Sequence, residues 1–123
     1  MNIVLSNTSE TPIYQQIFEQ LRAQIINGEM KSETCLMPIR TVAKELRISV
    51  ITVKKAWEEL EHSGYIYTIT GKGCFVSLLL PKELDSKKNE LAVQKVKKDI
   101  QYYQSLGLSK QEVLALVERY YQE

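Results

Sequence analysis

Histidine, cysteine and catalytic motifs are scarce in this sequence. Its 123 residues include one histidine and two cysteines. With His62 as the only imidazole, most zinc sites and most pairs of a nucleophile with histidine are excluded. The Thr-Gly-Lys-Gly stretch at residues 70–73 lies between two β-rich runs and opens no helix, so it is not a phosphate-binding loop. We therefore predict no enzyme, no catalytic residue, no metal site and no cofactor.

Membrane-spanning and secretory segments are missing as well. The apolar run from Leu78 to Leu80 is far shorter than the roughly 18 residues that a membrane span requires. Residues 1–5 contain no basic region and no long apolar stretch, so they do not resemble a secretory signal. We expect a cytoplasmic protein with no membrane partner.

The two cysteines, Cys35 and Cys74, do not have the spacing of metal ligands. Cytosolic cysteines are usually reduced, and our first interpretation is that both are small buried hydrophobic side chains. A second hypothesis is a redox-sensitive pair. It requires a short strand near Cys35 to pair with the strand that contains Cys74, so that oxidation distorts the hairpin.

Overall charge is small, but its distribution is uneven. The net charge is +1 and the pI is about 7.7, whereas nucleic-acid-binding domains often have a pI above about 9. Between Pro38 and Trp57, however, five cations face the single acid Glu45. A local positive surface attracts a polyanion even when the whole protein is nearly neutral, although a solvated helix surface would have the same composition. The five cations are Arg40, Lys44, Arg47, Lys54 and Lys55.

Three helices are predicted in the first half of the chain. The first has Thr11 as its N-cap and Pro12 at its first position, carries an apolar residue every four positions from Ile13 to Ile25, and ends at Asn27-Gly28. The second runs from about Pro38 to Leu46. Ser49 caps the third, and Gly64 ends it. This is the spacing of a helix-turn-helix, with Val53, Ala56, Trp57 and Leu60 on the buried face of the third helix.

A β-hairpin is predicted directly after the third helix. Residues 65–68 and 74–78 are rich in β-branched and aromatic side chains, and Gly71-Lys72-Gly73 lies between them. A hairpin in this place is the wing of a winged helix-turn-helix.

The last third of the chain is predicted to form two helices. The first begins near Leu84 and ends before Gly107, and Ser109 with Glu112 predicts a capping box for the second. Because two helices of one chain cannot enclose a ligand cavity of several hundred cubic ångströms, we interpret their apolar stripes as packing or a dimer contact. The alternative, an effector pocket lined by these residues, requires a dimer to close it. The junction from Leu78 to Pro81 is apolar and is expected to be packed. The stripes consist of Val93, Val96, Ile100, Tyr103, Val113, Val117, Tyr120 and Tyr121.

These patterns together resemble the GntR family of bacterial winged-helix regulators, and the short helical tail resembles its YtrA-type subfamily. The similarity extends over essentially the whole chain. It is carried by the segments Pro12-Ile13-Tyr14-Gln15-Gln16-Ile17, Gly28-Glu29-Met30-Lys31, Leu36 with Arg40 and Ala43, Ser49, Thr52-Val53-Lys54, Ala56, Leu60-Glu61, Gly64 and Gly71-Lys72-Gly73-Cys74-Phe75-Val76.

The resemblance implies which residues meet DNA. Arg40 is expected to contact DNA, the start of the third helix to face the backbone or the major groove, and the wing near Gly73 to approach the minor groove. Helix-terminal N–H groups and hydroxyls suit phosphate, and arginine suits guanine. The predicted DNA-contacting set is Arg40, Ser49, Val50, Ile51, Thr52, Lys54, Lys55, Gly71, Lys72 and Gly73.

Two departures from the family pattern affect this interpretation. Leu36 is followed by Met37-Pro38 in place of the usual Pro-Ser, so a serine cap is lost. Val50 replaces the arginine that usually follows the capping serine, with Ile51 beside it. These two side chains cannot donate hydrogen bonds but can touch thymine methyl groups, so we expect an operator unlike the common family sites.

The predicted architecture is mostly α with a small β-hairpin wing. Residues 1–78 form a winged helix-turn-helix domain, and residues 79–123 form a two-helix dimerisation element. We expect a homodimeric transcription regulator, by default a repressor, on a palindromic double-stranded DNA operator with half-sites about 34 Å or a multiple apart. The alternative is a winged helix that binds a protein. An unidentified small-molecule effector is a further candidate partner.

Overall fold

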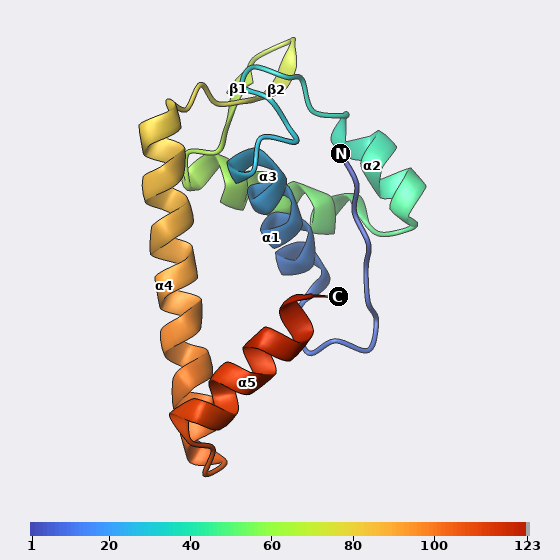
Figure 1. Cartoon of the computed structure of the whole chain (residues 1–123). Helices are drawn as coiled ribbons and strands as arrows, with labels where there is room; N and C mark the ends of the chain where they lie inside the picture. The colour runs from blue at the N-terminus through green and yellow to red at the C-terminus, as the bar shows by residue number, and fades with distance from the viewer. Residues whose placement is uncertain (123) are drawn as a thin grey trace. The chain divides into compact units, whose positions relative to one another are not determined.

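A computed structural model describes residues 1–122 of the chain. Over these residues the fold is mostly helical, as predicted, with five helices and one two-stranded antiparallel sheet (Figure 1). The chain divides into two compact units, Met1–Leu84 and Asp85–Glu123. No helix within the described part of the chain combines the length and the apolar character needed to cross a membrane.

The first helix, α1 (Ile13–Ile26), begins one residue later than predicted. Pro12 precedes the helix with φ −55° and ψ 148°, and no side chain caps the helix. The ring of proline sets φ to a value that suits both helical and extended backbone, so only ψ distinguishes them, and here ψ is extended. The predictions of Pro12 inside the helix and of Thr11 as its N-cap were therefore wrong. The predicted C-terminus is confirmed, with Asn27 as the C-cap and Gly28 at φ 86°.

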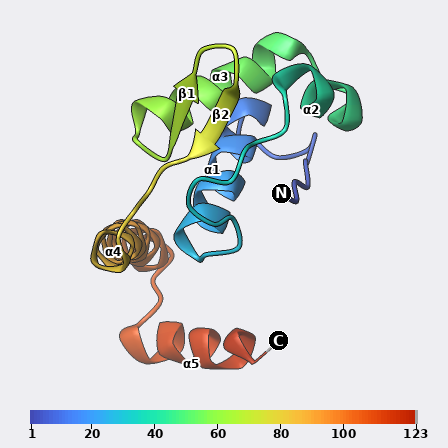
Figure 2. The same cartoon turned by 90° about the horizontal axis from the view of Figure 1, so that it is seen from above.

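Helices α2 (Ile39–Leu46) and α3 (Val50–His62) form the helix-turn-helix. Arg47 turns the chain between them in the left-handed conformation, with φ 57°. Helix α3 packs against α1, α2 and the hairpin, so it is the central element of this unit (Figure 2). Its predicted apolar face is confirmed, and Gly64 follows with φ 82°. The largest fully buried side chains of the core are Ile17, Leu21, Leu60, Val42, Val53 and Val76.

The N-terminal segment is held along α1 by three glutamines spaced four residues apart. Asn2, Val4 and Ser6 each donate a backbone N–H to one glutamine side chain and accept from the amide nitrogen of the same side chain. Two residues of extended chain advance about 6.6 Å, and four residues of helix advance about 6.0 Å, so the two repeats match. The partners are Gln24 for Asn2, Gln20 for Val4 and Gln16 for Ser6.

We expect Gln16→Ala to be the most destabilising single change in this ladder. Gln16 is only 9% exposed, and its side chain bonds the N–H and C=O of Ser6 and the C=O of Thr11. Its loss leaves three part-buried backbone groups without these partners, at a total cost of about 1–3 kcal/mol. Urea unfolding is the measurement, with Gln24→Ala at the exposed end of the ladder as the matched control. Equal losses in both variants would show that burial of Gln16 contributes nothing.

The predicted hairpin is present as β1 (Ile66–Ile69) and β2 (Gly73–Val76), paired from Ile66 with Val76 to Ile69 with Gly73. An isolated bridge joins Cys35 to Phe75, which confirms the short extended segment expected near Cys35. The N–H of Leu36 donates to the C=O of Cys74 at 2.8 Å, and the N–H of Val76 donates to the C=O of Thr34 at 2.9 Å. The chain before α2 is thus fixed to the base of the hairpin.

The pairing register separates the two cysteines. Cys35 is opposite Phe75, so its side chain shares the sheet face of Phe75, and a Cβ added at Gly73 on that face would lie 3.8 Å from the Cys35 Sγ. Cys74 alternates to the other face, where its Sγ lies 3.4 Å from the Thr68 hydroxyl. Both cysteines are free, and a disulfide between opposite faces requires backbone movement. The redox-pair hypothesis is therefore disfavoured, and because Cys35 is exposed, its interpretation as a buried hydrophobe was also wrong.

Helices α4 (Pro81–Ser105) and α5 (Lys110–Tyr121) follow the hairpin. The capping box of Ser109 with Glu112 is confirmed. Neither helix contains a buried residue in the isolated chain. Leu78 and Leu80 are exposed, so the expectation of a packed junction was wrong for these two side chains. On α4, the hydrogen bond and the charge of Asp99 raise the pKa of Lys95, one turn earlier.

Candidate nucleic-acid interface

The cations of α2 and α3 lie on the surface. Arg40, Lys44, Arg47, Lys54 and Lys55 are all exposed. None of these five cations forms a salt bridge with a residue of the described range 1–122. The local excess of positive charge seen in the sequence is therefore available to an external polyanion.

The start of α3 is shaped by a side-chain cap. The Ser49 hydroxyl accepts the N–H of Thr52 at 3.1 Å, as predicted, and lies 2.7 Å from the Thr52 hydroxyl. The N–H of Val53 turns inward to the C=O of Ser49. The N–H groups of Val50 and Ile51 belong to the first turn, where a helix has no internal acceptor for them. A helix N-terminus of this kind favours an anion such as phosphate.

Two apolar side chains follow the cap, and they differ in exposure. Val50 is 38% exposed and Ile51 is 78% exposed. Ile51 lies on the side of α3 opposite the buried residues, one turn before Lys55. Among the large apolar side chains described in Met1–Leu84, none is more exposed than Ile51.

Lys55 has an additional partner that the sequence did not reveal. Its Nζ lies 4.0 Å from the ring centroid of Tyr14 on α1, a distance at which a cation is attracted to the ring. Lys54 makes no such contact with an aromatic ring of residues 1–122. The two adjacent lysines, which we grouped together as DNA-contacting residues, therefore lie in different surroundings.

The hairpin turn presents exposed backbone. Residues 70–73 are all exposed, and the N–H of Lys72 closes the turn by donating to the C=O of Ile69 at 2.9 Å. Gly71 and Gly73 have φ of 80° and 119°, values that strain any residue with a Cβ. Behind the turn, Tyr67 and Phe75 stack across the strands with ring centroids 5.7 Å apart. Two paired strands with stacked rings thus carry a narrow, exposed tip that can approach another surface closely.

The structure brings several of the ten predicted residues together along the chain. Ser49, Val50, Ile51 and Thr52 form one cap and first turn, and Gly71 to Gly73 form one turn. Arg40 is the second residue of α2, four positions after Leu36, whose backbone is bonded to β2. The sequence analysis did not predict that Tyr14, the second residue of α1, contacts Lys55. The pairing of the segment near Cys35 with β2, on which the redox hypothesis depended, is present through the bonds of Thr34 and Leu36 to the hairpin.

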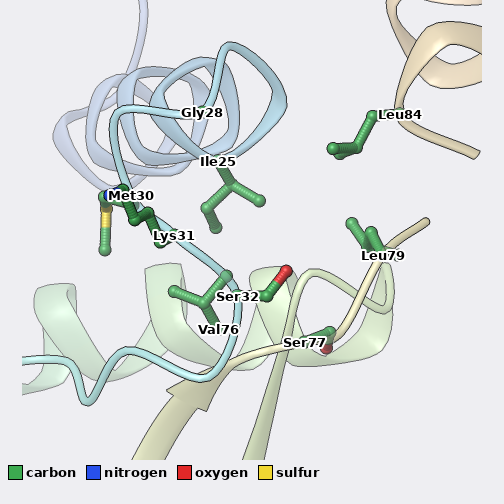
Figure 3. Close-up of a pocket in the computed structure, with 9 residues that line it drawn as sticks. All are labelled: Ile25, Gly28, Met30, Lys31, Ser32, Val76, Ser77, Leu79 and Leu84. Atoms are coloured by element: carbon green, nitrogen blue, oxygen red, sulfur yellow. The ribbon is translucent and has the colours of Figure 1, made fainter. Parts of the chain in front are cut away.

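A small cavity lies at the base of the hairpin, away from these residues. It measures about 140 Å³ and is bounded by side chains of α1, the turn after it, and the chain on either side of Ser77 (Figure 3). Ligand sites usually measure about 300–1,000 Å³, so this cavity is too small for most effectors. Its lining residues are Ile25, Gly28, Met30, Lys31, Ser32, Val76, Ser77, Leu79 and Leu84.

Comparison with known families matches residues 13–76, which cover α1 through β2, to the family described as "Bacterial regulatory proteins, gntR family". The chain belongs to the GntR family. The match covers more than half of the 123 residues and contains all ten residues of the predicted interface.

Two curated GntR relatives come from Bacillus subtilis. The HTH-type transcriptional repressor NagR is 43% identical over 77 residues, which are 63% of this chain and 31% of NagR. The HTH-type transcriptional repressor YtrA is 37% identical over 75 residues, which are 61% of this chain and 58% of YtrA. The matched segments thus span less than two thirds of either relative. The likeness to YtrA agrees with the YtrA-type subfamily.

Among solved structures, a GntR family transcriptional regulator from Listeria monocytogenes resembles this chain with a TM-score of 0.78 at 26% identity. The similarity covers 94% of this chain and 98% of the Listeria chain, so it includes the segment after the hairpin. The winged helix with a helical tail is therefore a shared architecture.

Proposed function

We propose that this protein is a sequence-specific, homodimeric repressor of transcription that binds a palindromic operator. Family membership makes it a regulatory protein, and two relatives are named transcriptional repressors. The observation that carries the proposal has two parts. The N–H groups of Val50 and Ile51 lie at the start of α3, where the helix has no internal acceptor for them, and the cations of α2 and α3 form no salt bridge. Such a protein acts in the cytoplasm, where bacterial DNA lies.

In this proposal, each predicted residue has a role in DNA binding. The first turn of α3 enters the major groove, with its N–H groups toward a phosphate and its side chains toward the base edges. Arg40 has the fork of donors that guanine or phosphate accepts. Lys54, Lys55 and Lys72 neutralise phosphates, and the glycines of the turn let the hairpin backbone approach the minor groove.

Residues 79–123 serve as the dimerisation element in the same proposal. Helices α4 and α5 leave their apolar stripes uncovered in the isolated chain, and a contiguous exposed apolar surface marks an interaction site. A second copy of the chain supplies a matching stripe, because two-fold symmetric contacts use the same surface twice. Two recognition helices then reach successive major grooves of one operator.

The alternative function, a protein-binding winged helix, is favoured by the exposed Ile51 alone. The two functions predict different responses to salt. DNA binding releases counterions, so the affinity falls with a log–log slope of about −0.9 for each phosphate that is neutralised. An apolar protein contact has no comparable slope.

We expect selection from a random duplex DNA library to recover a two-fold symmetric sequence. The measurement is the affinity of the purified full chain for the selected duplex at several salt concentrations, with a scrambled duplex as the control. A steep salt dependence and a clear preference over the scrambled duplex support the proposal. Recovery of no preferred sequence would contradict it and would favour the protein-binding function.

A further inference from the structure

We propose that Ile51 reads a thymine methyl group in the major groove, so that each operator half-site has a thymine that the first turn of α3 contacts through its C5-methyl. This inference rests on the proposed DNA-binding function. It goes beyond it by assigning one residue of this chain to one chemical group of one base.

Ile51 lies at the start of the recognition helix. It is the second residue of α3, and in helix-turn-helix proteins the N-terminal residues of the recognition helix contact the base edges. At 78% exposure, Ile51 extends well beyond Val50, which is 38% exposed and partly covered by its own domain. Of the two apolar residues, Ile51 is therefore the one that reaches a base.

The neighbouring polar side chains already form hydrogen bonds within the helix cap. The hydroxyls of Ser49 and Thr52 lie 2.7 Å apart, and the Ser49 oxygen also accepts the N–H of Thr52. They complete the helix cap and have reduced capacity for hydrogen bonds to bases. The most protruding group of the first turn is thus a hydrocarbon.

A methyl group distinguishes thymine from the other bases in the major groove. Guanine, cytosine and adenine present donors and acceptors there, and thymine alone among the four presents a methyl group. An isoleucine placed against a polar base edge leaves that edge without a hydrogen bond, which is unfavourable. Isoleucine is also stiff about χ1, so little side-chain entropy is lost when it is held against one methyl group.

The test removes single methyl groups from the DNA. In the selected operator, each thymine is replaced by deoxyuridine, symmetrically in both half-sites, and the affinity of the full chain is measured. We expect replacement at one thymine position to lower the affinity about fourfold for each methyl group removed, or roughly fifteenfold for the symmetric pair. The reason is that burial of one such group contributes about 0.8 kcal/mol. At the other thymines the change is expected to be small.

The Ile51→Ala variant links that position to the residue. This variant should bind the thymine and deoxyuridine operators with nearly equal affinity, which is the coupling that a double-mutant cycle measures. Val4→Ala, which shortens another strongly exposed side chain, is the control and should keep the full effect of deoxyuridine. Both variants should unfold at the wild-type temperature, since both side chains are exposed.

The outcomes separate this inference from the proposed function. Strong, salt-dependent binding of the operator without any sensitive thymine would overturn the role of Ile51 and leave the repressor proposal intact. An equal effect of deoxyuridine on wild type and Ile51→Ala would also overturn it. Failure to select any operator would remove both, and the exposed Ile51 would then fit a protein anchor.

Discussion

The double variant Val96→Asp/Ile100→Asp should be monomeric and should bind the operator at least about a hundredfold more weakly than the wild type. Val93, Val96, Ile100 and Tyr103 recur at steps of three and four residues, which places them on one side of α4. Val96 is 53% exposed and Ile100 is 43% exposed in the isolated chain. Two aspartates in a paired stripe bring four carboxylates into an apolar contact, where unpaired charge is strongly unfavourable.

The loss of affinity follows from losing the second half-site. In a dimer the second recognition helix binds at an effective concentration set by the tether, and such linkage contributes about 10²–10⁴ in apparent affinity. Sedimentation equilibrium measures the oligomeric state, and titration of full operators and isolated half-sites measures the linkage. The variant should bind a half-site nearly as well as the wild-type chain does, with only the modest weakening that its added negative charge causes.

The control for this variant is Gln94→Asp/Gln101→Asp. It adds the same two charges to α4 at exposed positions that lie off the stripe. It should remain dimeric and should bind the operator with only the modest weakening that added negative charge causes through long-range repulsion. A dimeric Val96→Asp/Ile100→Asp protein with wild-type affinity would rule out this face of α4 as the dimer contact.

Arg40→Ala should lower operator affinity by about 2–6 kcal/mol, which is roughly thirtyfold or more, in a dimer that uses this residue twice. Each bidentate contact of arginine with guanine is worth about 1–3 kcal/mol against the wrong base. Arg40 is exposed near the start of α2 and has no ion pair among the described residues. Its removal should therefore leave the temperature of thermal unfolding almost unchanged.

Arg40→Lys distinguishes the two contacts that arginine can make. Lysine keeps the charge but lacks the planar fork, so a phosphate contact should survive and a guanine contact should be lost. Arg22→Ala, which removes an arginine that stacks on Phe18 of α1, is the matched control. The measurement is fluorescence anisotropy with labelled operator. If Arg40→Ala weakens binding no more than Arg22→Ala does, Arg40 does not contact the operator.

Much of the fold could be predicted from the sequence because its signals are local. The cap at Ser49, the capping box at Ser109 and the helix-ending Gly64 each act within one helical turn. The buried face of α3 follows from spacing alone, since residues three and four apart share one side of a helix. The hairpin was equally visible, because its glycines supply the backbone angles that the turn requires.

The sequence predicted which residues form the candidate interface, but it did not predict how the surroundings of these residues differ. No local rule separates Lys55, which lies over Tyr14, from its neighbour Lys54. Spacing likewise did not distinguish Val50 from Ile51. Packing of α3 within its domain leaves Val50 partly covered and Ile51 mostly exposed.

The amino-acid sequence by itself determined the order of the helices, the hairpin and the family to which the chain belongs. Only the tertiary structure decided how the N-terminal segment is held, which face each cysteine occupies and how exposed Ile51 is. The glutamine ladder joins residues as far as 22 positions apart, and the bridge from Cys35 to Phe75 joins two separate segments. Caps and periodicity act over about four residues, so they cannot specify contacts whose partners meet only after the chain has folded.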